Sequence, residues 1–321
     1  MMEDRMNDEL MKLIKKEFNK DILDIEEIEG GWLTEKWKIQ FKDVTIMLKV
    51  IEHKKINRRD INIELAANLL KKAYDFGIKC PRIFKVNDRL VNYNKNNNPM
   101  VVIEYLEETF SKDYTNINNG DIYSIGAELA KLRKCFNEIN IDKKIDYHKI
   151  IEKMHNEYNK RLDEGKYVEY LNDVLKQKRI LDLLNYDFFK NFEIGYCHGD
   201  LSQDNILFDK NGFRALVDFE IANLSFVLRD IARIFLTFCL DNNGKINKEL
   251  LKNLMDGYNR FGKLTFEDLI NGIKILWCLE VNLWIKEAYY IDNTPEKVKK
   301  FMYEINWITD NWFDLENIIK I

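Results

Sequence analysis

The chain has 321 residues, a length that suggests two domains or one large one. Hydrophobic residues make up 46% and aromatic residues 12%, enough for a sizeable core, so wholesale disorder is excluded. The 50 Lys and Arg residues nearly balance the 54 Asp and Glu residues, for a net charge of -4. A general nucleic-acid binder needs a basic field to neutralise phosphates, so we expect no nucleic-acid partner.

The cysteines and the apolar runs bear on the compartment. The five cysteines form no C-x-x-C pair and are odd in number, which argues against a disulfide framework or a zinc knuckle. The first eight residues are too charged for a signal peptide. No apolar run reaches the roughly 18–20 residues that span a bilayer. We therefore expect a cytoplasmic protein without a membrane partner.

The first third of the chain mixes helical and strand patterns. Apolar residues recur at helical spacing from Asp8 to Phe18 and from Asp60 to Tyr74. Alternating or β-rich segments predict strands at 37–41, 46–50, 89–93 and 100–105. The last two strands flank an Asn-rich stretch ending in Pro99, which is typical of a hairpin loop.

The remaining two thirds are mostly helical by pattern. One clear amphipathic stripe runs from Ile122 to Phe136. Further helical patterns cover roughly 146–185, 228–240, 246–260, 265–291 and 295–318. Short strands interrupt them at 194–197, 206–208 and 213–218. This shift predicts an N-terminal lobe at 1–105 and a larger helical lobe at 106–321.

The most informative stretch reads Cys197-His-Gly-Asp-Leu-Ser-Gln-Asp-Asn-Ile-Leu-Phe208. It places Asp200 and Asn205 in a polar loop between two short strands, and Asp218 follows at the end of the next strand. Carboxylate and amide oxygens are hard ligands suited to Mg²⁺. An additional carboxylate beside such a metal could accept a proton from an attacking hydroxyl.

This stretch resembles the kinase catalytic loop H-x-D-x-x-x-x-N, followed by a metal-binding Asp on the next strand. The variant His-Gly-Asp, with Asp-Phe-Glu at 218–220, is similar to the aminoglycoside phosphotransferase and choline kinase family. The resemblance implies a two-lobed, protein-kinase-like α+β fold with an antiparallel sheet in the small N-terminal lobe. It also implies that Asp200 is the catalytic base and that Asn205 and Asp218 hold Mg²⁺.

The N-terminal part of the chain supplies the other elements that this resemblance requires. Lys49 lies on a predicted strand, on the face opposite Leu48, and would neutralise the phosphates of ATP. Glu64 on the following helix would orient Lys49 through an ion pair. The pair Gly30 and Gly31 would form a shortened nucleotide loop. The backbone around Glu104, Tyr105 and Leu106 would pair with the adenine edge.

Two further residues receive supporting roles from the same resemblance. His198 would brace the catalytic loop by packing and hydrogen bonding, and Asp230 in Arg229-Asp-Ile-Ala232 would do so from the next helix. Asp230 follows Asp218 by only twelve residues, which leaves no room for a long activation loop. A protein kinase is therefore disfavoured, and the acceptor is expected to be a small molecule.

The acceptor itself stays open among aminoglycosides, choline or ethanolamine, homoserine, methylthioribose and sugars. Asp-Phe-Glu in place of Asp-Phe-Tyr slightly disfavours homoserine. Trp277, Glu280 and Trp284 share one helix face, which predicts either plain packing or a site for a cationic acceptor. The rival to an enzyme is a non-catalytic protein on the same fold, such as the spore-coat branch of the family. The oligomeric state cannot be read from the sequence.

Overall fold

The computed structural model describes residues 8–28, 34–52, 61–141, 145–164, 171–190, 192–284 and 296–320. Contacts divide the chain into two compact units. The first unit combines Met1–Ser111 with His198–Asn223, and the second combines Lys112–Cys197 with Leu224–Ile321. The division into functional lobes after residue 105 stays a prediction. Among the helices in the described ranges, none is both long and apolar enough to cross a membrane.

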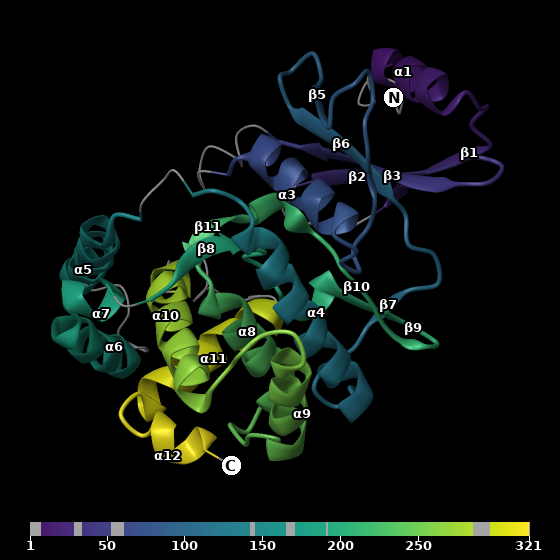
Figure 1. Cartoon of the computed structure of the whole chain (residues 1–321). Coiled ribbons are helices and arrows are strands. Elements are labelled where there is room, and N and C mark those ends of the chain that lie inside the picture. Colours follow the sequence, from purple (N-terminus) through teal and green to yellow (C-terminus); the bar gives the residue numbers. More distant parts are fainter. Residues whose placement is uncertain are drawn as a thin grey trace. The chain divides into compact units, whose positions relative to one another are not determined.

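The first unit is built on an antiparallel sheet (Figure 1). In its described part the strand order is β1-β2-β3-β6-β4, and β5 also pairs with β6. The strands are β1 (Asp24–Ile28), β2 (Thr34–Gln40), β3 (Thr45–Ile51), β4 (Ile83–Phe84), β5 (Val91–Tyr93) and β6 (Pro99–Glu104). The helices of this sheet are α1 (Asp8–Phe18) and α3 (Ile63–Asp75). The predicted helix at 8–18 is confirmed, and the second predicted helix begins after its cap Asn62.

The two faces of the central strand β3 have different tasks. Leu48 and its same-face neighbours join a buried cluster with Ile14 of α1 and Trp37 of β2. Side chains alternate along a strand, so Lys49 and Ile51 face the other way. They line a small cavity together with apolar residues of α3. Because side chains alternate along the strand, Lys49 lies on the face of the sheet that α3 covers, and it is buried there.

A second, smaller sheet in the same unit includes the strand that follows residues 198–205, which we call the catalytic-loop segment after their predicted role. Its order is β10-β9-β7, from β7 (Phe110–Ser111), β9 (Ile206–Asp209) and β10 (Gly212–Leu216). Two short 3-10 turns, η2 (Gln203–Asn205) and η3 (Phe219–Ile221), flank the β9–β10 hairpin. The amide of Leu216 donates to the carbonyl of Lys79 at 2.9 Å, which joins this hairpin to the segment that follows α3.

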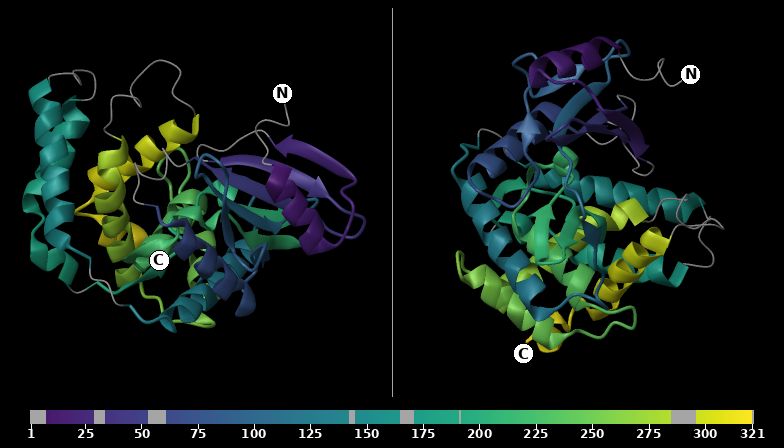
Figure 2. Two further views of the ribbon diagram at one scale, coloured as in Figure 1. Left: turned by 90° about the horizontal axis from the view of Figure 1, so that it is seen from above. Right: turned by 90° about the vertical axis from the view of Figure 1, so that its right-hand side faces the viewer.

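The second unit is mainly helical, as the sequence predicts. A two-stranded sheet of β8 (Ile194–Cys197) and β11 (Asn223–Phe226) accompanies the helices. Helices α5 and α6 pack against each other in all views (Figures 1 and 2). The helices are α4 (Asn119–Asn137), α5 (Tyr147–Glu164), α6 (Leu171–Leu183), α7 (Tyr186–Lys190), α8 (Leu228–Ile234), η4 (Phe235–Cys239, a π-helix), α9 (Lys248–Asn259), α10 (Phe266–Trp284), α11 (Glu296–Asn311) and α12 (Leu315–Ile319).

Helices α4 and α9 approach each other through glycines. A Cβ at Gly257 would lie 2.0 Å from the carbonyl oxygen of Tyr123, and one at Gly126 would lie 2.2 Å from that of Leu254. Both obstacles are backbone atoms, which cannot swing aside as a flexible side chain can. The close approach of these two helices therefore depends on the missing side chains.

Gly257→Ala should destabilise the protein, because the added methyl group forces α4 and α9 apart. We expect a loss of about 1–3 kcal/mol in the free energy of unfolding, as for other overpacked sites. Urea denaturation measures it. The control is Gly120→Ala in the first turn of α4, where the nearest atom is the side-chain oxygen of Asn118 at 3.3 Å. Equal stabilities of the two variants would contradict this account of the helix contact.

Candidate active site

The centre of the site is the side chain of Lys49, which is only 4% exposed. Its Nζ donates to Oδ1 of Asp218 at 2.7 Å and to Oε1 of Glu220 at 2.5 Å. Asp218 lies 169 residues further along the chain than Lys49. The fold thus brings together the strand lysine and the carboxylate that the sequence predicted as a metal ligand, and it adds a second carboxylate.

The turn that carries both carboxylates has an unusual backbone. Asp218 adopts φ 71° and ψ 58°, the left-handed region, immediately before the 3-10 turn η3. Non-glycine residues in this region are uncommon and are found at functional sites. This conformation lets Asp218 and Glu220, two residues apart, both reach Lys49.

The electrostatics of the turn favour an ionised Asp218. Burial is the largest single influence and raises the pKa of this carboxyl, but the charge of Lys49, the charge of Lys36 and the hydrogen bond from Lys49 together outweigh it. The pKa of Asp218 therefore lies below its ordinary value. Lys36 on β2 pairs in register with Lys49 on β3, so both lysines occupy the same face of the sheet.

The sequence reasoning did not identify Glu220 or Lys36. The signal for Lys36 is strand alternation, because its neighbour Trp37 belongs to the core on the opposite face. The signal for Glu220 is its position two residues after Asp218, although only the observed backbone turn shows that it reaches Lys49.

The catalytic-loop segment is held by the buried ring of His198. Its Nε2 donates to the carbonyl of Val217 at 3.0 Å, and its Nδ1 accepts from the amide of Asp200 at 3.3 Å. These two bonds fit a neutral ring with the proton on Nε2. The ring also contacts Phe219, with 4.4 Å between ring centroids. His198 thereby joins the loop around Asp200 to the strand that precedes Asp218.

Asn205 makes a second connection in the same loop. Its Nδ2 donates to the carbonyl of Asp200 at 2.8 Å, and its own carbonyl accepts from the amide of Val217 at 2.9 Å. The side chain is buried at 6% exposure. Asp200, Asn205 and Asp218 are therefore fixed relative to one another by hydrogen bonds within the first unit.

Not every predicted site residue joins this network. Oε1 of Glu64 accepts from Oη of Tyr93 at 3.2 Å, and the structure does not bring Glu64 to Lys49. Gly30 and Gly31 lie outside the described residues. The amide of Glu104 donates to the carbonyl of Arg82 at 2.7 Å, and that of Tyr105 to Thr45 at 3.1 Å. The carbonyl of Leu106 accepts from Oγ1 of Thr109 at 3.0 Å.

Asp230 belongs to the second unit, in the first turn of α8. It lines a small internal cavity with Arg133, Tyr196 and Tyr258. Burial, with a smaller contribution from the charge of Asp230, raises the pKa of the Cys197 thiol well above its ordinary value. Asp230 thus lies near the end of β8, and its bracing role stays a prediction.

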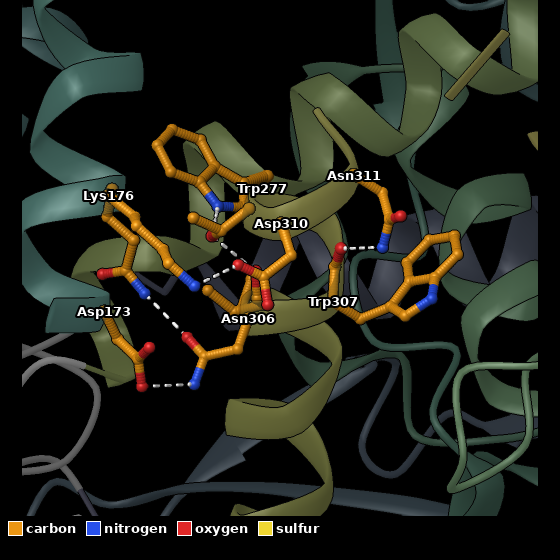
Figure 3. Close-up of polar contacts among 10 residues, drawn as sticks. Asp173, Lys176, Trp277, Asn306, Trp307, Asp310 and Asn311 are labelled. Carbon is orange, nitrogen blue, oxygen red and sulfur yellow. Dashed lines mark hydrogen bonds and ion pairs between the residues drawn. The ribbon is translucent and has the colours of Figure 1, made fainter. Parts of the chain in front are cut away.

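The aromatic and acidic face of α10 is used for packing in the described residues. Trp277 is fully buried, and its Nε1 donates to Oγ1 of Thr309 at 2.9 Å on α11 (Figure 3). Glu280 faces Arg233 at 3.7 Å. The side chain of Trp284 lies outside the described part of the chain. Of the two interpretations of this face, packing accounts for Trp277 and Glu280.

A buried lysine paired with an aspartate, beside an H-x-D-x-x-x-x-N loop, defines a kinase-like phosphotransferase site. The model of the phosphotransferase enzyme family (APH) matches residues 24–263. The chain belongs to this family. The predictions of the family, of the kinase-like α+β fold and of a phosphotransferase enzyme are therefore confirmed.

The chain is also similar to individual kinases, and the two solved structures among them share its fold. A homoserine kinase of Zymomonas mobilis subsp. mobilis is 22% identical over 258 residues, 79% of this chain and 77% of the relative. Choline kinase LicA from Streptococcus pneumoniae has a TM-score of 0.60 at 16% identity, over 94% of this chain and 99% of that one. An amicoumacin kinase in complex with AMP-PNP and Ca²⁺ has a TM-score of 0.67 at 11% identity, over 98% and 96% of the two chains.

Gly199→Ala tests how closely the catalytic loop approaches the turn after Asp218. Gly199 has φ 86°, and a Cβ there would lie 3.0 Å from the carbonyl oxygen of Ile221. Gly77 is the matched control, because its φ is 87° with no atom within 4 Å of its Cβ position. Both variants carry the backbone penalty of about 1–2 kcal/mol. Gly199→Ala should lose clearly more stability in urea denaturation, and equal losses would exclude the close approach.

Asp218 should also contribute to the way the stability of the folded protein decreases at acidic pH. Because its pKa is lowered in the folded state, its contribution is present above the unfolded-state value of about 4 and is lost as pH falls through the folded value. Asp218→Asn should therefore flatten the fall in melting temperature between about pH 5 and pH 2. An unchanged slope in this range would contradict the pairing with Lys49.

Proposed function

We propose that this chain transfers the γ-phosphoryl group of ATP to a hydroxyl group of a small molecule, with Mg²⁺ as the cofactor. The observation that carries the proposal is the contact of the buried Lys49 with Asp218, beside the hydrogen-bonded loop of Asp200 and Asn205. A non-catalytic scaffold gains little stability from a buried charge pair, because desolvation offsets most of its attraction. Phosphoryl transfer needs these charges at one point.

Each residue has a distinct task in this proposal. Lys49 neutralises charge on the ATP phosphates, and Lys36 adds positive charge on the same face. Asp218 and Asn205 would hold Mg²⁺, which lowers the charge on the phosphates, and their hard oxygens fit that ion. The lowered pKa of Asp218 supports this role, because a metal ligand must be ionised.

Asp200 accepts the proton of the acceptor hydroxyl in this proposal. The acceptor oxygen attacks the γ-phosphorus, the bond to the bridging oxygen breaks, and ADP leaves with the electron pair. The hydrogen bonds of His198 and Asn205 fix the main chain of Asp200, from which its carboxylate extends. Catalysis then comes mainly from positioning and charge neutralisation.

The acceptor that we favour carries both a hydroxyl group and an amino or ammonium group. The names of two relatives support this choice, because homoserine and choline both combine these groups. The homoserine kinase relative also favours homoserine, a candidate that the sequence had slightly disfavoured. Aminoglycosides and sugars remain possible acceptors.

The five free, buried cysteines support a reducing, cytoplasmic location.

Asp200→Asn should abolish transfer while sparing nucleotide binding. General-base contributions are typically 10²–10⁴-fold, so we expect kcat to fall by about that factor. The affinity for ATP with Mg²⁺, measured by calorimetry, should change less than about threefold, since Asp200 does not bind the nucleotide in this proposal. Retained transfer in this variant would remove Asp200 from the role of base.

An acceptor screen tests the function as a whole. ATP consumption is measured with homoserine, choline, 1-amino-2-propanol, spectinomycin and a neutral sugar, with Asp200→Asn as the blank. We expect turnover with at least one of the amino alcohols. The rival, a non-catalytic binding or spore-coat protein, predicts no turnover. It would be favoured further if millimolar ATP with Mg²⁺ left the melting temperature unchanged.

A further inference from the structure

The helix face that approaches Lys49 is apolar. The cavity beside Lys49 is lined on the side of α3 by Ile63, Ala66, Ala67 and Leu70. These positions have the i, i+3, i+4, i+7 spacing of a single helix face. None of the four side chains can accept a hydrogen bond, so this face cannot supply the partner of an ammonium group.

The carboxylate of α3 is engaged elsewhere. Glu64 follows Ile63 by one residue, which turns it about 100° around the helix and away from the cavity face. Its Oε1 accepts from Oη of Tyr93 on β5. Burial is the main cause that raises the pKa of Tyr93 above its ordinary value, and the charge of Glu64 and this hydrogen bond add to it. Glu64 therefore interacts with the sheet through a different strand from that of Lys49.

We propose that Glu220 is the positioning residue of Lys49, in the place where the sequence predicted Glu64. This inference rests on the proposed function, which does not say which residue orients Lys49. Lys49 has three N–H donors, of which one reaches Asp218 and one reaches Glu220. The third donor can then be directed at a phosphate oxygen.

The surroundings make the contact with Glu220 strong. The side chains of Lys49 and Glu220 are only 5% and 12% exposed, against 30% for Asp218. Water screens such a pair less than an exposed one, and the apolar cavity behind it lowers the local dielectric. Glu220 is thus the better shielded of the two partners of Lys49.

The turn that carries Asp218 and Glu220 links the proposed metal site to the position of Lys49. Asp218 and Glu220 leave the same turn, so the turn that would hold the metal also orients the lysine. The position of Lys49 then depends on this turn and not on a carboxylate from α3. Substitutions at Glu220 should accordingly weaken nucleotide binding far more than substitutions at Glu64.

The first experiment compares Glu220→Gln with Glu64→Gln in the full chain. Calorimetry gives the Kd for ATP with Mg²⁺ and with EDTA, and steady-state kinetics give KM for each substrate and kcat. For Glu220→Gln we expect the Kd for ATP to rise at least tenfold both with Mg²⁺ and with EDTA. With Mg²⁺ we expect the KM for ATP to rise similarly and the KM for the acceptor to stay unchanged. Glu220→Asp, which keeps the charge, should recover part of the loss.

Two outcomes would overturn the proposal. One is a loss in Glu64→Gln equal to or larger than that in Glu220→Gln. The other is a loss seen only with Mg²⁺, which would make Glu220 a metal ligand in place of a positioning residue. Asp75→Asn is the matched control, because it removes an exposed carboxylate of α3 that pairs only with Lys71 in the described structure.

A second experiment does not depend on catalysis. Urea denaturation of the nucleotide-free protein is measured for Lys49→Met, Glu220→Gln and the double variant. If the two residues are partners, the double variant should lose clearly less stability than the sum of the single losses. Additive losses would refute the contact. If the wild-type chain binds no ATP, the proposed function fails, while this cycle still decides whether Glu220 holds Lys49.

Discussion

The structure of the first unit depends on neutralising one buried ammonium group. Strand alternation turns Lys49 away from the core cluster around Leu48 and into a space that is otherwise apolar. A lone charge there would cost several kcal/mol, so the fold must bring carboxylates to it. Asp218 and Glu220 meet this need from a segment far along the chain. The contacts of Lys49 with Asp218 and Glu220 therefore constrain where the catalytic-loop segment lies relative to the sheet.

That constraint explains the backbone around the site. Asp218 takes a left-handed conformation, and Gly199 also has a positive φ where the loop approaches the carbonyl of Ile221. Such conformations persist when their surroundings over-determine them. Here the determinants are the Lys49 contact on one side and the hydrogen bonds of His198 on the other. Local strain and charge pairing thus support a single arrangement of Asp200, Asn205 and Asp218.

The sequence was most informative where the chemistry depends on short spacing. The loop from His198 to Asn205 and the face of Lys49 follow from local patterns, because a loop motif and strand alternation need only neighbouring residues. The partner of Lys49 could not be found in this way. Glu64 has a suitable spacing, but the side of α3 that approaches Lys49 is apolar. Which carboxylate reaches the lysine is decided by helix rotation and by the turn at Asp218, and both are tertiary features.

In the second unit too, the sequence pattern alone did not show which charged partner an acidic residue has. Glu280 stood out in the sequence as part of a possible cationic site, yet it faces Arg233, whose Nη2 also donates to Glu304 at 2.7 Å. Burial raises the pKa of Glu304, while Arg233 opposes that rise. Glu280 and Glu304 therefore share the positive charge of Arg233 inside the helical packing. An acidic residue that already pairs with an arginine is a weak candidate for binding a cation, so the sequence pattern alone does not make Glu280 an acceptor-binding residue.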